Sequence, residues 1–451
     1  MTGKPPALIG AILLAIVLPS LVNPWAALPF EPAKVDFLRM ILVVLFASSL
    51  IVQGGQWWRQ VRSGSHLSSA IRGQPMGTQL MLAGAILFAL GSVLSTLLSN
   101  DIRYSLWGGS DRHGAVTTLC GVLLYLLLAS QLQSSGQVMA VILALAAGSV
   151  PVCLYGFAQY AGLDPLAWQT DSVSPVLSTL GRSNFVAAYL AVIIPLTLVI
   201  AWRSLNIQAA TAKVAGTVLV VMQVGCLALT QARAGWLAFV TGCAVFLAIA
   251  CWPHGRRRAL LTVVLFVVSS STMFWGLERG LVPAMELSSP AAEGASVAER
   301  REESIERRYT IWRHTLPLIS ERWFAGYGPE MFMQVFNRRY PPGTLYDGSD
   351  TVVDDPHNVM LELAVNVGIV GLAAWLLMVC GYFVRLYQWR RCERDQLRPQ
   401  LAAGLAGAMV AYLIQAQLNP DVVVLTMLFW LLLAMVTGLR VPPIRRVATA
   451  E

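Results

Sequence analysis

Long runs of apolar residues, separated by polar links, dominate the chain. Twelve of them approach the length of a membrane-spanning helix, because a hydrocarbon core of about 30 Å takes about 20 residues. They are Ala7–Val22, Val35–Val52, Thr78–Leu98, Val116–Leu132, Val138–Ala161, Phe185–Ala201, Ala215–Thr230, Trp236–Cys251, Ala259–Phe274, Val359–Val384, Leu401–Ala416 and Val422–Leu439. Apolar residues are continuous in these runs, which predicts an all-α polytopic membrane protein with about 12 transmembrane helices and does not fit the alternating strands of a β-barrel.

Lysine and arginine fall mainly on one side of these predicted helices. Cytoplasmic links carry an excess of both residue types. With both termini in the cytoplasm, seventeen cations lie on the cytoplasmic side, against six on the other side outside one long link. The pattern therefore predicts a multi-pass protein with both ends cytoplasmic.

The long outward link runs from about Trp275 to Pro356. Within it Ile305, Tyr309, Trp312 and Leu316 recur at helical spacing, which predicts an amphipathic helix. Three regions follow from this link: residues 1–274 with nine transmembrane helices, residues 275–356 as the loop region, and residues 357–451 with three more helices and a short tail.

Composition supports the membrane assignment and excludes other classes. The chain is 56% hydrophobic and only 12% charged, whereas soluble domains carry about 25% charged residues. The net charge of +8 is spread over the links, so topology explains it and no nucleic-acid partner is expected. The seven cysteines form no CxxC pair, which disfavours a zinc or disulfide framework.

Two outward links place an arginine beside a predicted helix. Arg182 precedes the sixth helix, where Ser183 or Asn184 can act as N-cap, and a helix N-terminus attracts phosphate. Arg233 lies in the short link before the eighth helix, at the depth where a lipid-linked phosphate sits. For each of them the alternative is an arginine that anchors a helix end at the membrane interface.

Two further features lie in and after the long link. Arg308 is on the apolar side of the amphipathic helix, where it can bind an anion or simply stack on Trp312. Asp355 is the expected N-cap of the tenth helix, with Pro356 at its first position and His357 in its first turn. His357 suits a general base; the alternatives are a hydrogen bond to the loop, or a metal site that includes Asp354 and Asp355.

Some motifs are absent from the sequence. It has no phosphate-binding loop of the G-x-x-x-x-G-K-[ST] type, so chemistry driven by a nucleotide is not expected. Charged residues within the apolar runs are sparse, Glu362 being the clearest, whereas ion-coupled carriers usually hold charges near the midplane.

The order of several short motifs resembles the O-antigen ligase family, which also includes O-antigen polymerases and bacterial protein O-oligosaccharyltransferases. The resemblance covers roughly Leu80 to Leu439. The motifs are Ser105–Gly108, Tyr155–Gln159, Gly181–Asn184, Thr230–Trp236, Arg308–Trp312, Gly326–Pro329, His357–Asn358 and Asn366–Gly371. The family often has serine where this chain has Ala232, while the following arginine is kept.

The resemblance implies a GT-C-like glycosyltransferase of the Gram-negative inner membrane with a periplasmic active site. Its donor would be a glycan on undecaprenyl diphosphate and its acceptor a sugar hydroxyl of lipid A–core, with no metal or other cofactor. By position, His357, Arg233 and Arg308 match the family's essential residues. Arg182 is a weaker match, and Asn184, Asn358 and Trp312 are expected to contact substrate.

Within the family, an O-antigen polymerase and a protein O-oligosaccharyltransferase use the same donor and remain alternatives. Outside it, a lipid-linked glycan transporter and a non-catalytic assembly scaffold also remain open. The identity of the glycan and of the acceptor sugar does not follow from the sequence.

Overall fold

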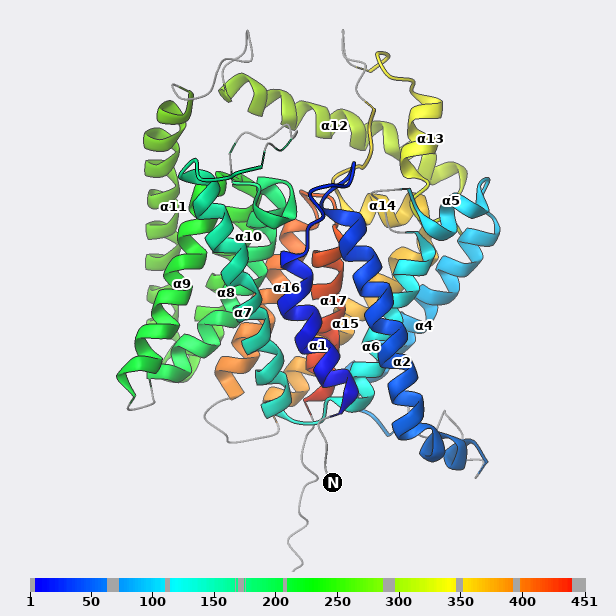
Figure 1. Cartoon of the computed structure of the whole chain (residues 1–451), viewed down its shortest axis with the longest axis horizontal. Helices are drawn as coiled ribbons and strands as arrows, with labels where there is room; N and C mark the ends of the chain where they lie inside the picture. The colour runs from blue at the N-terminus through cyan, green and yellow to red at the C-terminus, as the bar shows by residue number, and fades with distance from the viewer. Residues whose placement is uncertain are drawn as a thin grey trace, which may run out of the picture.

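The structure is a computed structural model that describes residues 5–62, 73–109, 114–166, 168, 174, 176–205, 209–286, 297–345, 352–391 and 398–439. These residues form helices and contain no β-strand, which confirms the predicted all-α membrane class. Most of the helices stand roughly side by side in one bundle, and the others lie across one end of it (Figure 1). That end is called the cap end below.

Twelve helices make up the bundle. They are α1 (Pro6–Val17), α2 (Glu31–Arg62), α4 (Met76–Leu97), α6 (Ala115–Gln131), α7 (Ser135–Tyr160), α8 (Ser183–Leu205), α9 (Ala210–Thr230), α10 (Arg233–Cys251), α11 (Arg256–Glu286), α15 (Gly368–Arg391), α16 (Arg398–Gln415) and α17 (Val423–Gly438). The cap end carries α5 (Ile102–Trp107), α12 (Val297–Glu321), α13 (Phe332–Arg339) and α14 (Val359–Asn366). Three short 3₁₀ helices, η1 (Leu18–Ser20), η2 (Ser178–Leu180) and η3 (Trp252–His254), lie in the links.

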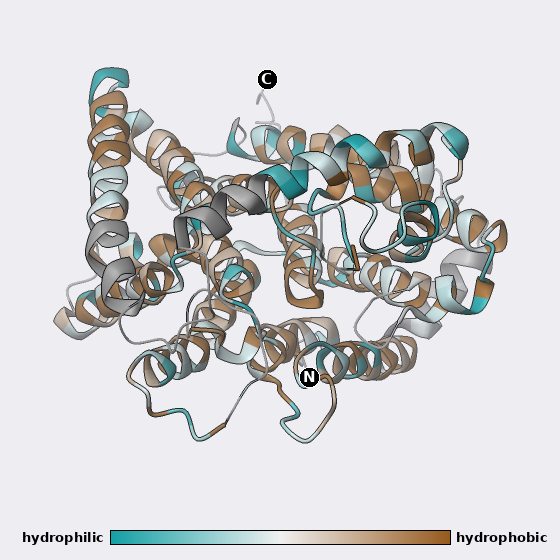
Figure 2. Cartoon of the chain, turned by 90° about the horizontal axis from the view of Figure 1, so that it is seen from above, coloured by the Kyte–Doolittle hydropathy of each residue, from teal (hydrophilic) through white to brown (hydrophobic). Residues whose placement is uncertain are grey.

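All twelve predicted apolar segments are helical. Among the described residues, eight helices are long and apolar enough to cross a membrane: Glu31–Val52, Met76–Leu97, Ser135–Tyr160, Ser183–Leu205, Ala210–Thr230, Arg233–Cys251, Arg256–Gly276 and Gly368–Arg390. Three apolar helices are shorter, Pro6–Ser20, Ala115–Gln131 and Val423–Gly438. Seen along the bundle, the helices carry mostly hydrophobic colours (Figure 2), as expected for a polytopic membrane protein.

Small residues let these helices approach closely. A Cβ atom added at Gly77 of α4 would lie 2.3 Å from the backbone nitrogen of Arg385 in α15. A Cβ at Gly242 of α10 would lie 2.7 Å from the carbonyl oxygen of Gly407 in α16. In lipid, helices gain little from burying apolar surface, so contact between backbones is the main route to tight packing.

The tenth predicted segment, Val359–Val384, is two helices. α14 ends at Asn366 and α15 begins at Gly368, which has φ 70°. A Cβ on Gly368 would lie 2.2 Å from the carbonyl oxygen of Phe324. The prediction of one continuous helix is therefore wrong, because hydropathy does not register a break at a single left-handed glycine.

The turn after α12 supplies hydrogen bonds at this break. Tyr327 N–H donates to the Val365 carbonyl at 2.9 Å, Gly328 N–H to the Asn366 carbonyl at 2.9 Å, and Ile369 N–H to the Trp323 carbonyl at 2.8 Å. The broken helix is thus satisfied by protein, as non-helical backbone near a bilayer must be. The consequence is a fixed position for α14 beneath α12.

The helix before the long link extends further than its apolar run, whose candidate membrane span ends at Gly276. α11 continues past Phe274 to Glu286, so the ninth helix extends beyond the expected start of the loop at Trp275. The predicted amphipathic helix is present as α12, which runs across the cap end (Figure 1). Ile311 and Leu318 lie on its buried side, while Tyr309 and Leu316 are exposed.

We predict that Gly368→Ala destabilises the protein by about 1–3 kcal/mol, because alanine is strained at positive φ and its Cβ meets the Phe324 carbonyl. Thermal unfolding of the purified protein in detergent measures the effect. Gly54→Ala in α2 is the matched control, since no heavy atom lies within 4 Å of its added Cβ. Equal melting temperatures for the two variants would contradict the role given to Gly368.

Candidate functional site

Arg182 is the residue immediately before α8. Its carbonyl accepts hydrogen bonds from the backbone N–H groups of Phe185 at 3.0 Å and Val186 at 3.2 Å, so Arg182 itself is the N-cap. The prediction of Ser183 or Asn184 as N-cap is wrong by one or two positions, because both are already helical. The Arg182 guanidinium lies 5.9 Å from the Phe185 ring centroid.

The link that carries Arg182 is held from both sides. Gly181 has φ 82°, and a Cβ there would lie 2.5 Å from the Phe30 ring. The buried Lys34 donates to the carbonyls of Phe30 at 2.8 Å and Thr179 at 2.9 Å. Because its three ammonium donors can serve several carbonyls, Lys34 ties the start of α2 to the segment before Arg182. The hydropathy pattern does not predict this role for Lys34.

The Tyr155–Gln159 motif has a structural role in the same link. The Gln159 side-chain oxygen accepts from the backbone N–H groups of Leu177 at 3.0 Å and Ser178 at 2.6 Å. Its nitrogen donates to Asp164 at 2.8 Å, and the Tyr155 hydroxyl donates to the same carboxylate at 3.0 Å. The motif therefore orders the backbone that leads to Arg182.

The Asp164 carboxylate collects several donors. The indole N–H of Trp168 lies 3.0 Å from it, and the backbone N–H of Leu166 donates at 3.0 Å. Burial alone would raise the pKa of Asp164, but the hydrogen bonds, that of Gln159 first, lower it below its usual value. An ionised Asp164 thus fixes the orientation of Trp168.

Arg233 is the first residue of α10. The preceding Gln231 has φ 55°, a left-handed conformation that is costly for a residue with a side chain. A Cβ at Gly235 would lie 2.3 Å from the Cβ of Ala187, so the first turns of α10 and α8 are in contact. The two arginine-bearing helix starts, at Arg182 and Arg233, therefore lie beside each other at the cap end, and Arg233 is exposed.

Arg308 is half-buried on α12 and has no hydrogen-bond or ion-pair partner among the described residues. Burial lowers the pKa of its guanidinium. One helical turn later, the indole N–H of Trp312 donates to the Pro356 carbonyl at 2.7 Å. This bond places the Arg308 face of α12 next to the segment that holds His357.

His357 precedes α14 and lies outside it. Its φ is 53°, another left-handed non-glycine conformation. The buried Asp355 accepts a hydrogen bond from the His357 backbone N–H, and its Oδ1 lies 3.7 Å from His357 Nδ1. The predicted helix start at Pro356 is therefore wrong: Asp355 closes a tight turn instead of capping the helix, as aspartate often does.

Asn358 is the N-cap of α14. Its side-chain oxygen accepts from the backbone N–H groups of Met360 at 3.0 Å and Leu361 at 3.1 Å. The next residue, Val359, donates its N–H to the Ala416 carbonyl at 2.8 Å. The structure thus gives Asn358 a capping role, and the helix start is fixed against the link between α16 and α17.

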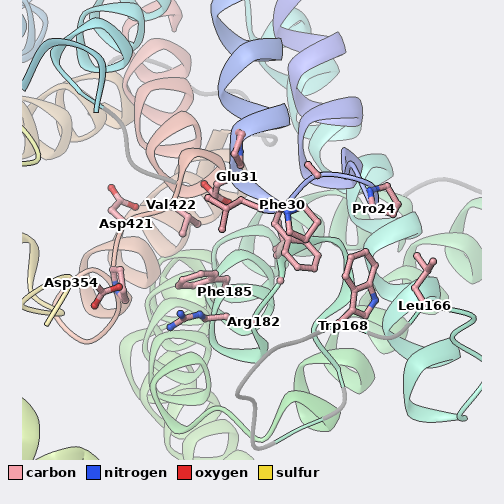
Figure 3. Close-up of a pocket in the computed structure, with 18 of the residues that line it drawn as sticks. Pro24, Phe30, Glu31, Leu166, Trp168, Arg182, Phe185, Asp354, Asp421 and Val422 are labelled. Atoms are coloured by element: carbon pink, nitrogen blue, oxygen red, sulfur yellow. The ribbon is translucent and has the colours of Figure 1, made fainter. Parts of the chain in front are cut away.

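A cavity of about 560 Å³ opens at the cap end, and it is called the cap-end cavity below. Arg182 and Asp354 both line it, so the structure brings these two predicted features together. Figure 3 shows Arg182 and Phe185 between the Asp354 and Asp421 carboxylates on one side and the Phe30 and Trp168 rings on the other. His357, Arg233, Arg308 and Asn184 are not among its lining residues.

The sequence patterns do not predict most of the charged groups that line this cavity. Glu31, Glu330 and Asp421 line it together with Asp354. Glu330 has φ 63° and, with Asp421, also lines a second cavity of about 110 Å³ that contains Glu362. The acids come from four separate parts of the chain, the start of α2 and three links, so no local motif marks them.

A metal site formed by Asp354, Asp355 and His357 is not favoured by the geometry. Within the described part of the chain, no group of three His, Cys, Asp or Glu side chains is placed to hold a metal ion. His357 and Asp355 instead form a close pair.

One family model matches part of the chain. Residues 218–376 match the family model described as O-antigen ligase, which confirms the resemblance over that region. The match includes Arg233, Arg308 and His357 and excludes Arg182. A comparison with curated proteins gave no match. The family supports a glycosyltransferase-like ligase or polymerase activity in a multi-pass membrane protein.

We predict that Asn358→Ala lowers the stability by about 1 kcal/mol, because the two N–H groups at the start of α14 lose their side-chain acceptor. Asn358→Asp keeps an acceptor oxygen and should retain the wild-type melting temperature. Chemical or thermal unfolding in detergent compares the variants. A wild-type melting temperature for Asn358→Ala would exclude the capping role.

Proposed function

We propose that this chain, with its O-antigen ligase match over residues 218–376, is an O-antigen ligase of the bacterial inner membrane. It transfers a glycan from undecaprenyl diphosphate to a sugar hydroxyl of lipid A–core. The cap end faces the periplasm, and both termini are cytoplasmic. The observation that carries the proposal is the Trp312–Pro356 hydrogen bond, which joins the helix of Arg308 to the loop of His357 inside the matched region.

The reaction needs its leaving group held as an anion. The bond between the anomeric carbon and the phosphate oxygen breaks, and undecaprenyl diphosphate leaves with the electron pair. Arginine binds phosphate oxygens with two parallel N–H groups. Arg308 suits this role because its half-buried guanidinium has no partner within the described residues. Arg233 adds a second cation at a helix N-terminus, where anions are favoured.

The acceptor hydroxyl needs a base. His357 Nε2 takes its proton while the oxygen forms the new bond to the anomeric carbon, and the Asp355 carboxylate near Nδ1 stabilises the resulting imidazolium. Direct attack on an α-linked donor inverts the anomeric centre. The positive charge of the arginines replaces a metal ion in this scheme.

An O-antigen polymerase is the second candidate, because the family match supports either activity. It uses the same donor and a second lipid-linked glycan as acceptor. The lipopolysaccharide of a deletion strain separates the two: a ligase deletion loses all glycan-capped bands, whereas a polymerase deletion keeps a single capped repeat. A protein acceptor would instead leave lipopolysaccharide unchanged.

We predict that His357→Ala lowers transfer by about 10²–10⁴-fold, the usual contribution of a general base. The measurement is transfer of lipid-linked glycan to lipid A–core by the purified full-length protein. His314→Ala is the matched control: this histidine is on α12, where its ring packs at 4.9 Å from that of Tyr340, and it should keep wild-type transfer. Full transfer by a folded His357→Ala protein would exclude the catalytic role of this histidine, whereas absence of transfer by the purified wild-type protein would favour a transporter or scaffold.

We predict that Arg308→Lys lowers turnover by about 10²-fold, because lysine keeps the charge but loses the fork that matches a diphosphate. Arg313→Lys, an exposed position on the same helix, is the control and should turn over normally. Single-turnover rates at saturating donor provide the comparison. Equal rates for the two variants would show that bidentate binding at Arg308 is not needed.

A further inference from the structure

One side of the cap-end cavity is an aromatic surface of fixed orientation. The Phe30 and Trp168 ring centroids lie 4.9 Å apart, and both rings line the cavity. The Trp168 indole N–H lies 3.0 Å from both the Tyr155 hydroxyl and the Asp164 carboxylate. Aromatic side chains bring a large apolar surface at low entropic cost when their orientation is already fixed. Such a surface suits the C–H face of a sugar ring.

The opposite side of the cavity is acidic. Asp354 and Asp421 lie there, Glu31 lines the upper wall in Figure 3, and Glu330 also lines the cavity. Two of these carboxylates are held in place: Asp421 accepts from the Tyr412 hydroxyl at 2.7 Å, and Glu31 accepts from the Val423 backbone N–H at 3.1 Å. Carboxylates accept hydrogen bonds from hydroxyl and ammonium groups.

The formal charges of the described lining residues sum to a negative value. Arg182 is the one cation among its described lining residues, against four acids. Lys34 lies behind the lining, where its ammonium group is used by the carbonyls of Phe30 and Thr179. A ligand with its own carboxylate or phosphate would meet like charge here, and like-charge juxtaposition selects strongly against a partner.

We propose that the cap-end cavity is a sugar subsite selective for neutral or amino sugars, with the Phe30–Trp168 surface stacking on the ring and Asp354, Glu330 and Asp421 accepting its hydroxyl or ammonium hydrogens. The proposal rests on the proposed glycosyl transfer and adds that sugars carrying a carboxylate or phosphate are rejected. Arg182, between the two sides, contacts the end of the glycan nearest the diphosphate.

The position of Asp354 links this subsite to the chemistry. Asp354 lines the cavity three residues before His357, and Asp355 between them is buried against the His357 turn. A glycan in the cavity therefore ends near the candidate base. We expect the diphosphate to bind outside the cavity, beside Arg233 and Arg308, which do not line it.

The test measures binding of three soluble trisaccharides to the full-length protein in nanodiscs: N-acetylchitotriose, its de-acetylated glucosamine form, and trigalacturonic acid. We expect saturable binding in the order amino, neutral, acidic, with the acidic trimer at least tenfold weaker than the neutral one. Trp168→Ala should weaken binding of the first two by at least tenfold. Trp25→Ala, at a 92% exposed tryptophan on the same end, is the matched control.

Charge is tested separately from stacking. Asp354→Asn should reduce the preference for the amino trimer over the acidic trimer by about tenfold, whereas Asp36→Asn, at an exposed position on α2, should leave it unchanged. The proposal is overturned if the acidic trimer binds as tightly as the amino trimer, or if Trp168→Ala binds all three like wild type. Absence of saturable binding by both the amino and the neutral trimer overturns it as well.

Transfer kinetics distinguish whether the donor glycan or lipid A–core occupies the cavity. If the donor glycan occupies the cavity, Trp168→Ala raises the KM for the lipid-linked donor; if lipid A–core occupies it, the KM for the acceptor rises instead. An unchanged KM for both substrates counts against the subsite. Failure of the proposed function would appear differently, as absence of glycan transfer by the wild-type protein with trisaccharide binding intact.

Discussion

The arrangement at the cap end depends on one constraint: backbone N–H and C=O groups that are buried away from water must find partners within the protein. The interruption between α14 and α15 exposes such groups, and the turn at residues 323–328 satisfies them through hydrogen bonds to Val365, Asn366 and Ile369. Gly368 makes the close approach possible. Because α14 is fixed in this way, the residues just before it, His357 and Asn358, are fixed as well.

The same end of the molecule holds unusual backbone conformations. Among the described residues, the non-glycine residues with positive φ are Ser178, Gln231, Glu330 and His357. Each costs of order 1–3 kcal/mol and persists only when its surroundings determine it. Three of them adjoin candidate site residues or the cavity, and the fourth, Ser178, is held by Gln159 before Arg182. Observed strain at these positions is consistent with a site whose side chains are oriented in advance.

Hydropathy was sufficient to predict the helical class and all twelve apolar segments, because apolar length is set by bilayer thickness. It failed at Gly368, where one residue divides a continuous apolar run, and at α11, where the helix extends into polar sequence to Glu286. The sequence predicts Asp355 as the N-cap of α14. In the structure, the Asn358 side chain instead accepts the hydrogen bonds from N–H groups in the first turn of this helix. Either residue type suits an N-cap, so the choice depends on the turn that Asp355 forms with His357.

The candidate arginines and histidine were found through motifs, whereas the cavity acids were not. Glu31, Glu330 and Asp421 come from separate parts of the chain, and each is ordinary in its own sequence context. Only the packing of α2, α8, α17 and the turn after α12 brings them together. The role of the motif Tyr155–Gln159 does not follow from the sequence, since its partners, Asp164 and the backbone at residues 177–178, are defined by the fold.

The two-residue connection between α9 and α10 restricts the position of Arg233. Gln231 and Ala232 alone separate Thr230 from Arg233, so the guanidinium cannot move far from the ends of two bundle helices. In the proposed mechanism, Arg233 therefore binds the diphosphate close to the membrane anchor of the lipid-linked substrate. Under the proposed function, sugars far from that anchor lie beyond the reach of Arg233, so glycans of very different lengths would present the same reacting end to it.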